Sequence, residues 1–202
     1  MNATLTDIRD ECEGFGTHDP EYFKKQIHKV PDAPVVKRVD YILNACKDKV
    51  VLSLGCSGRL QPKIEAVAKE SYGLDIDPQK CGNFRCMDLD DIDDPRDVPG
   101  PWRNIELVVA GEILEHLTNP GQLLRALKLC RCPVLITVPN SHTDGGRYFL
   151  SKGFENVNSD HVAYYSWFTL KKLVEKCGYE VKDFAWYNGK PLFAEGLIMV
   201  VE

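Results

Sequence analysis

The apolar run Val50-Val51-Leu52-Ser53-Leu54 places the strongest constraint on the fold of this chain. A strand with one face in water alternates apolar and polar residues, whereas a strand covered on both faces is apolar almost throughout, as in a parallel sheet. Similar runs recur at residues 105–110 and 133–138, and segments of helical periodicity separate them. Strands that alternate with helices in this way predict an α/β protein built on a mostly parallel sheet.

The expected elements follow from apolar periodicity and from turn residues. We expect helices at 35–46, 60–70, 120–129 and 169–177. We expect strands at 50–54, 72–75, 84–87, 105–110, 133–138, 179–186 and 192–201. Residues 141–160 are expected to form a polar loop. Asn188-Gly189 predicts a hairpin between the last two strands, and hence an antiparallel strand in the sheet.

The 202 residues are enough for one domain with a substantial core. Residues 1–34 are polar and interrupted by glycine and proline, which predicts an N-terminal arm with one short helix at 21–29. Residues 35–202 are expected to form the single folded domain. The sequence leaves open whether the protein is a monomer or a homodimer.

Composition narrows the classes of partner. The net charge of −5 argues against a nucleic acid, because phosphate binding needs a basic surface. No apolar run approaches the roughly 20 residues of a membrane span, and the first residues lack the pattern of a signal peptide. We therefore expect a cytoplasmic protein that binds neither membrane nor nucleic acid. The eight cysteines lack the spacing of zinc ligands, so we expect reduced thiols and no metal.

The first apolar strand leads directly into the loop Gly55-Cys56-Ser57-Gly58. A strand–loop–helix of this kind presents backbone N–H groups to a ligand, and its glycines allow close approach. Asp75 ends the next expected strand, where a carboxylate binds the ribose hydroxyls of an adenosine-type cofactor. Alternatively, Asp75 and Asp77 cap the following helix. The loop alone does not distinguish among classes of nucleotide-cofactor enzymes.

Four segments occur in the order and spacing of class I S-adenosylmethionine-dependent methyltransferases, which the chain resembles from about residue 35 to 201. They are the segments 51–59, 72–77, 87–89 and 106–117, of which Gly111-Glu112-Ile113-Leu114-Glu115-His116-Leu117 is the most specific. The resemblance implies a three-layer, Rossmann-like fold. Its seven-stranded sheet has the last strand antiparallel, between the fifth and sixth.

The resemblance also implies how S-adenosylmethionine is bound. The loop residues Gly55, Cys56, Ser57 and Gly58 flank the methionine part of the cofactor, and Asp75 holds the ribose hydroxyls. Ile76 packs on the face of the adenine ring, and Asp88, with Leu89 beside it, accepts a hydrogen bond from the adenine amino group. Gly111 and Glu112 face both the cofactor and the methyl acceptor.

Two departures from the family pattern keep other interpretations open. Ser53 replaces an acidic residue, and the glycine loop is one residue short; both are compatible with a weakly active binding or regulatory module of the same fold. A nicotinamide or flavin oxidoreductase is a further alternative. It predicts G-x-G-x-x-G after the first strand, which Gly55–Leu60 does not supply, and it leaves the hairpin unexplained.

The expected reaction moves a methyl group to a hydroxyl or amine of a small metabolite or sugar-like molecule. A hydroxyl acceptor benefits from a general base, and histidine has a suitable pKa. The candidate catalytic residues are His161, after the polar loop, and His116 and Glu112, after the 105–110 strand; His142 is a further candidate base. Each histidine also has a structural interpretation, as a hydrogen-bonding or packing residue at the start of an element.

Overall fold

The computed structural model describes residues 25–55, 58–78, 83–92, 94, 96, 104–128 and 130–202. The chain forms two compact units, Met1–Asp32 and Ala33–Glu202. All the helices and strands that the structure describes lie in the second unit. Residues 21–24 of the expected N-terminal helix lie outside the described ranges. Lys25 and Gln26 form a turn, and the backbone that follows is irregular.

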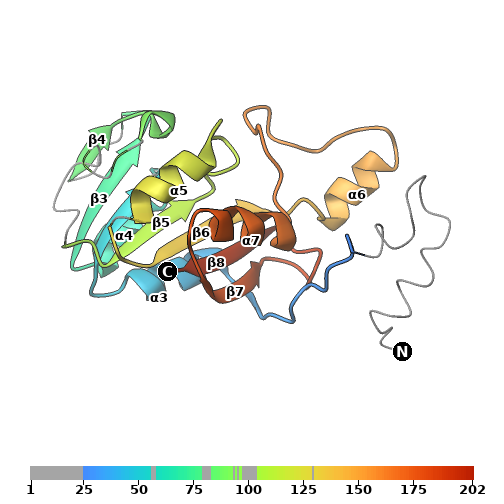
Figure 1. Ribbon diagram of the computed structural model, residues 1–202, viewed down its shortest axis with the longest axis horizontal. Helices are drawn as coiled ribbons and strands as arrows, with labels where there is room; N and C mark the ends of the chain where they lie inside the picture. Colours follow the sequence, from blue (N-terminus) through green and yellow to red (C-terminus); the bar gives the residue numbers. More distant parts are fainter. Residues whose placement is uncertain are drawn as a thin grey trace. The chain divides into compact units, whose positions relative to one another are not determined.

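A single mixed sheet forms the centre of the second unit, with the strand order β1-β7-β8-β6-β5-β2-β3-β4 (Figure 1). Its strands are β1 (Val35–Val36), β2 (Val50–Leu54), β3 (Glu70–Asp75), β4 (Phe84–Cys86), β5 (Leu107–Gly111), β6 (Val134–Pro139), β7 (Val181–Tyr187) and β8 (Gly196–Val201). All neighbouring strands are parallel except β8, which runs antiparallel to both β6 and β7. This confirms the expected mostly parallel sheet and the place of its antiparallel strand.

The edge strand β1 differs from the sequence expectation. Residues 35–46 were expected to be one helix, but Val35 and Val36 pair in parallel with the end of β7. The β-branched valines favour extended backbone, and the carbonyl of Pro34 accepts the N–H of Trp186. The sheet therefore has eight strands where the sequence predicted seven.

Helices cover both faces of the sheet, as expected for three layers. They are α3 (Arg38–Cys46), α4 (Gln61–Val67), α5 (Pro120–Lys128), α6 (Asp144–Leu150) and α7 (Trp167–Lys176), with a short 3-10 helix η1 at Leu89–Asp91. On one face, Ile42 and Ile64 from α3 and α4 pack against Val51 and Val109 of the sheet. Figure 1 shows α5 and α7 in front of the opposite face, and these helices contact each other.

Helix α6 lies within residues 141–160, which were expected to form a loop. The side chain of Thr143 caps it by accepting the N–H of Gly146. Gly145 and Gly146 in its first turn disfavour a helix by propensity, which explains why the sequence pattern missed it. Other helices differ from expectation only at their ends. Helix α7, for example, begins two residues early because Ser166 and Thr169 form a capping box.

The carboxyl ends of β2 to β6 all meet at one edge of the sheet, because these strands are parallel. The chain continues from β2 to β3 on one side and later returns to β5 on the other. Strand order therefore reverses next to the end of β2. In open α/β sheets, ligands bind in the crevice at this switch point.

Candidate functional site

Gly55 follows β2 at the switch point, and both its backbone conformation and its close contacts favour glycine. Its φ is +63°, in the left-handed region, and its N–H donates to the carbonyl of Leu74 over 2.9 Å. A Cβ on Gly55 would lie only 2.9 Å from Cδ1 of Ile113. Gly58 is exposed in the turn that leads to α4, while the predicted site residues Cys56 and Ser57 lie outside the described ranges.

The two expected cofactor carboxylates lie at the ends of β3 and β4. Asp75 pairs with Cys86 in the sheet, which brings the ends of these strands together. One oxygen of Asp75 accepts the N–H of Asp77, and one oxygen of Asp88 accepts the N–H of Asp90 at the start of η1. Among the described residues, each carboxylate thus accepts a local backbone hydrogen bond through Oδ1.

The two expected adenine-contacting side chains differ in exposure. Ile76 is 61% exposed although it is a large aliphatic residue, whereas Leu89 is buried at the start of η1. An exposed isoleucine beside a carboxylate at the end of a strand is the arrangement that a flat ring would cover.

Glu112 follows β5 and belongs to a network that joins three strands and α3. Its carboxylate oxygen Oε1 accepts hydrogen bonds from Thr137 Oγ1 over 3.0 Å and from the Tyr187 hydroxyl over 2.9 Å. Arg38 Nε donates to Thr137 over 2.9 Å and lies 3.8 Å from the same carboxylate oxygen. Glu112 itself has φ +58°, and its N–H donates to the Thr137 carbonyl.

Gly111, the last residue of β5, makes room for this network. A Cβ at Gly111 would lie 3.1 Å from a terminal guanidinium nitrogen of Arg38. Burial, and then the Glu112 charge, raise the pKa of Tyr187 well above its usual range, so its hydroxyl remains a donor. The network fixes Glu112 beside the end of β5 through one carboxylate oxygen, Oε1.

Glu115, His116 and His161 form a second cluster, close to Glu112. Glu115 is 1% exposed, and neither of its carboxylate oxygens has a hydrogen-bond partner among the described residues. One ligand-type atom from each of the three side chains lies within 4.8 Å of the others. The two imidazole rings meet edge to face with centroids 4.6 Å apart.

Burial is the main cause of the pKa shifts of Glu115 and His161 in this cluster. Burial, and then the negative charge of Glu112, raise the pKa of Glu115 to about 8. Burial and the neighbouring His116 lower the pKa of His161, against the opposing charges of Glu112 and Asp160. His161 is therefore held in its neutral form, which can accept a proton or bind a cation.

The backbone brings His161 to this cluster from a distant part of the chain. The N–H groups of Val162 and Ala163 donate to the carbonyl of Glu115 over 2.9 and 3.3 Å. The Tyr165 hydroxyl donates to the carbonyl of Leu114 over 3.2 Å. The segment that carries His161 is thus tied directly to the turn after β5.

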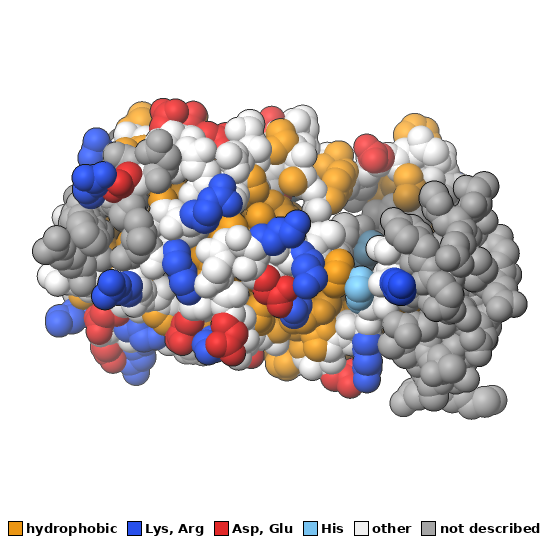
Figure 2. Space-filling view, in the orientation of Figure 1, with side chains coloured by type: hydrophobic (Ala, Val, Ile, Leu, Met, Phe, Trp, Pro, Cys, Tyr) orange, Lys and Arg blue, Asp and Glu red, His pale blue; other side chains and the backbone are white. Residues whose placement is uncertain are grey.

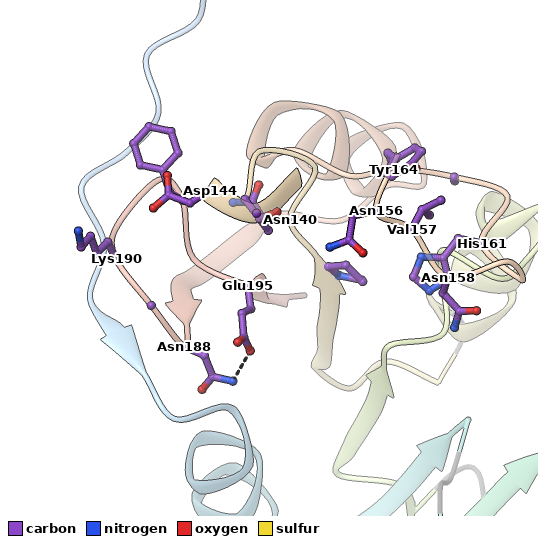
Figure 3. Close-up of a pocket in the computed structure, with 16 residues that line it drawn as sticks. Asn140, Asp144, Asn156, Val157, Asn158, His161, Tyr164, Asn188, Lys190 and Glu195 are labelled. Carbon is purple, nitrogen blue, oxygen red and sulfur yellow. Dashed lines mark hydrogen bonds between the residues drawn. The ribbon is translucent and has the colours of Figure 1, made fainter. Parts of the chain in front are cut away.

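A cavity of about 570 Å³ opens beside His161. Residues from the end of β6, from the 156–164 segment and from the β7–β8 connection line it (Figure 3). Its lining is rich in amides and charges: Asn140, Asp144, Asn156, Asn158, Asn188, Lys190 and Glu195. Figure 3 shows Asn188, Lys190 and Glu195 on one side, Asn156, Tyr164 and His161 on the other, and Asn140 between them.

Asn140 holds this cavity together. Its side-chain nitrogen donates to the carbonyls of Leu192 and Ala194, each over 3.0 Å, and its side-chain oxygen accepts the N–H of His142 over 3.1 Å. It is only 6% exposed. His142 itself lines a neighbouring depression with α6, apart from the cluster of Glu115, His116 and His161.

The structure brings most of the sequence-predicted residues to one edge of the sheet and adds others. Glu112, His116 and His161, predicted as separate candidates, are neighbours. The sequence reasoning missed Glu115, Arg38, Tyr187 and the amide-lined cavity. The available signal for Glu115 was its place in Glu112-x-x-Glu115-His116, where two carboxylates and an imidazole follow one strand.

On the face that Figure 2 shows, basic and acidic side chains are mixed, and neither kind forms a large patch of its own. None of the helices that the structure describes is long and apolar enough to cross a bilayer. All five cysteines within the described ranges are unpaired.

Comparisons with known proteins agree with this geometry. Residues 23–183 match the family described as methyltransferase domain. Among solved structures, an S-adenosylmethionine-dependent methyltransferase from Archaeoglobus fulgidus is similar with a TM-score of 0.59 and 16% identity, over 81% of this chain and 90% of the other. No curated protein is significantly similar to this chain in sequence.

Two further solved structures have named acceptors. The 1,6-didemethyltoxoflavin-N1-methyltransferase of Burkholderia thailandensis, with S-adenosylhomocysteine bound, has a TM-score of 0.60 at 14% identity, over 81% of this chain and 76% of the other. The small RNA methyltransferase HEN1 has a TM-score of 0.64 at 16% identity, over 87% of this chain. This chain spans only 27% of the HEN1 chain, and at such identities the likeness concerns the fold.

Proposed function

Because this chain belongs to the methyltransferase domain family and is an S-adenosylmethionine-dependent methyltransferase, we propose that it methylates a hydroxyl or amine of a small metabolite or sugar-like acceptor. One observation carries the choice of acceptor. The amide-lined cavity beside His161 opens next to the edge of the sheet where the cofactor residues lie. Its volume of about 570 Å³ falls within the usual range for small-molecule sites.

The proposed cofactor site follows the β2–β5 edge. Gly55, Cys56, Ser57 and Gly58 flank the methionine part, with Gly111 and Glu112 opposite. Asp75 accepts hydrogen bonds from the ribose hydroxyls, and Asp88 accepts one from the adenine amino group; the adenine ring lies on Ile76 and Leu89. The left-handed backbone of Gly55 and the exposed face of Ile76 support this assignment.

The cavity lining supports a hydroxylated acceptor. Asn140 is fully engaged in holding the cavity wall, but Asn156 and Asn158 on the opposite segment offer amide donors and acceptors. Lys190 and Glu195 add one charge of each sign. Apolar side chains, among them Val157, Tyr164 and Phe193, form the rest of the lining, so the cavity suits an acceptor with hydroxyl groups and an apolar face.

Methyl transfer needs the acceptor atom held in line with the sulfonium methyl, and positioning supplies much of the rate. Neutral His161, which lines the cavity, is placed to receive the proton of an acceptor hydroxyl. The His116 ring packs edge to face against the His161 ring, with centroids 4.6 Å apart. Glu112 is fixed between cofactor and acceptor by Thr137 and Tyr187.

Two alternatives are less well supported. HEN1 is described as a small RNA methyltransferase, but an RNA acceptor needs a basic footprint, and this chain has a net charge of −5. A weakly active regulatory module would not need a cavity with unengaged polar groups beside the cofactor edge.

We also propose that the protein acts in the cytoplasm, since the unpaired cysteines of the described residues suit a reducing compartment.

Two measurements test the function. Calorimetry of the full chain with S-adenosylmethionine should show binding at one site per chain. A screen of polyols, sugars, amines and a short oligoribonucleotide should then yield S-adenosylhomocysteine only with a small acceptor. Product formed only with the oligoribonucleotide would overturn the choice of acceptor, and cofactor binding without any product would favour the regulatory module.

A matched pair of variants tests the cavity. Asn156→Leu should raise the KM for the acceptor about tenfold, the expected cost of about one lost hydrogen bond, while cofactor affinity stays unchanged. Asn104→Leu is the control, because Asn104 is exposed ahead of β5, at the opposite edge of the sheet. Equal KM values for the two variants would exclude the cavity as the acceptor site.

A further inference from the structure

We propose that Glu115, His116 and His161 bind a divalent transition-metal ion at the wall of the acceptor cavity. The three side chains bring one carboxylate and two imidazoles together, and their ligand atoms lie within 4.8 Å of one another. His161 also lines the cavity. An ion held by these residues would therefore be reachable from the space that the acceptor occupies.

The strongest argument is the state of Glu115. Its side chain is 1% exposed, and both of its oxygens lack a hydrogen-bond partner among the described residues. An ionised carboxylate that is buried without a partner is strongly unfavourable, so Glu115 must be neutralised either by a proton, as its raised pKa allows, or by a bound cation. A metal ion coordinated by one or both of these oxygens would take the place of that proton.

No described cationic side chain is in direct contact with the Glu115 carboxyl group. Arg38 is the cation whose charge acts on Glu115, but its Nε is committed to Thr137 and lies beside Glu112. Glu112 adds a second negative charge near both Glu115 and His161. The Glu115 oxygens are thus left without a hydrogen-bond or ion-pair partner among the described residues, next to two imidazoles.

The backbone holds the ligands in place without a metal. Glu115 and His116 are adjacent in the turn after β5. The carbonyl of Glu115 accepts the N–H groups of Val162 and Ala163, next to His161. The third ligand is thereby tied to the first through main-chain bonds, so binding requires little rearrangement.

The donor set indicates the kind of ion. Imidazole nitrogen favours first-row transition metals, and a carboxylate is compatible with Mn²⁺, Fe²⁺, Co²⁺ or Zn²⁺. Two imidazoles with one carboxylate leave coordination positions open for further ligands. Mg²⁺ prefers oxygen ligands and keeps its waters, so we expect it to bind more weakly at this site.

The role of such an ion rests on the proposed methyltransferase function. A hydroxyl oxygen of the acceptor would occupy an open position, and the ion would lower the pKa of that hydroxyl. With its ring nitrogen on the ion, His161 acts as a ligand and no longer as the base, so the proton passes to water, and the oxygen forms a bond to the methyl carbon. The methyl–sulfur bond breaks, and its electron pair stays on sulfur to give neutral S-adenosylhomocysteine. This role favours a hydroxyl over an amine as the acceptor.

Titration of the chelator-treated full chain with Mn²⁺ alone, followed by electron paramagnetic resonance, tests the site without cofactor or acceptor. We expect one tight site per chain and a rise in Tm on adding Mn²⁺. Glu115→Gln and His161→Ala should each weaken Mn²⁺ binding at least 100-fold and abolish the rise in Tm. His161 is partly exposed, so its variant tests the site even if the Glu115 variant unfolds.

His142→Ala is the matched control, because His142 lies beside the neighbouring depression with α6 and outside the cluster. It should bind Mn²⁺ as the unmodified protein does. Equal loss in the His142 and His161 variants, or no binding to the unmodified chain, would overturn the proposal.

A second readout separates the metal site from the enzymatic function. Methyl transfer that continues unchanged in excess chelator would leave the function intact and overturn the role of the metal. Tight Mn²⁺ binding in a protein that transfers no methyl group to any acceptor would leave the metal site intact and overturn the function.

Discussion

The two sides of the site are built differently. On the β2–β4 side, Gly55, Asp75 and Asp88 follow strand ends, and the two carboxylates bond to N–H groups two residues away. On the β5–β8 side, side chains meet across the fold: Glu112 and Tyr187 are 75 positions apart in sequence, and Asn140 and Leu192 are 52 apart. The first side depends on local backbone, the second on tertiary contacts.

This difference predicts how substitutions act. On the β2–β4 side, removing a side chain should weaken ligand binding and leave folding nearly unchanged. On the β5–β8 side, removing a side chain should also destabilise the protein, because the same groups hold distant segments together.

Asp75→Ala should produce the largest effect on binding. Two charge-assisted hydrogen bonds, at about 1.5–3 kcal/mol each, imply at least a 100-fold loss of S-adenosylmethionine affinity by calorimetry. The free energy of unfolding should change little, because the bond from the Asp77 N–H is local and exposed. Asp77→Ala is the control and should retain affinity. Unchanged binding in Asp75→Ala would show that Asp75 only caps the backbone.

Asn140→Ala should produce the largest effect on stability. It removes a buried amide and leaves the carbonyls of Leu192 and Ala194 without their donor, which we expect to cost about 2–3 kcal/mol in urea unfolding. Asn158→Ala should change stability by less than about 0.5 kcal/mol, because the exposed Asn158 side chain accepts a single local hydrogen bond, from the Asp160 N–H. Equal losses in the two variants would contradict the contrast between the two sides.

Gly55→Ala is the exception on the β2–β4 side, because this substitution should lower the free energy of unfolding. Left-handed backbone costs alanine about 1–2 kcal/mol, and the contact with Ile113 at 2.9 Å adds to it. Gly153→Ala is the matched control, with φ +81° and no atom within 4 Å of the added Cβ. Urea unfolding measures the free energy of unfolding of both variants. A larger loss in Gly55→Ala than in Gly153→Ala measures the cost of the close contact with Ile113. Equal losses would mean that the turn after β2 rearranges to relieve that contact.

Tyr187→Phe should have the smallest effect, about 1 kcal/mol, from the loss of one hydrogen bond to Glu112. Tyr148→Phe, at an exposed position of α6, is the control and should lie within about 0.5 kcal/mol of the unmodified protein. Thermal unfolding of both variants measures the difference. A neutral result for Tyr187→Phe would show that Thr137 alone suffices to fix Glu112.

The same contrast explains what the sequence could predict. Strand ends and turn glycines read along the chain place Gly55 and Asp75 at the carboxyl edge of the sheet, and the family resemblance adds Gly111; their roles in binding stay predictions. Tyr187 and Asn140 join the site only when the fold brings β5, β6 and the β7–β8 connection together. Helix α6 was missed because its Thr143 cap outweighs the low propensity of two glycines, and β1 because its pairing partner lies in β7.

The place of β8 has a consequence for how the chain is made. Leu197, Ile198 and Met199 of β8 are completely buried between β6 and β7, yet a ribosome synthesises them after every other strand. Until they emerge, β6 and β7 present two unpaired backbone edges, which are templates for pairing with other chains. The nascent protein is therefore most exposed to misassembly just before β8 inserts, and the acceptor cavity closes only after that step.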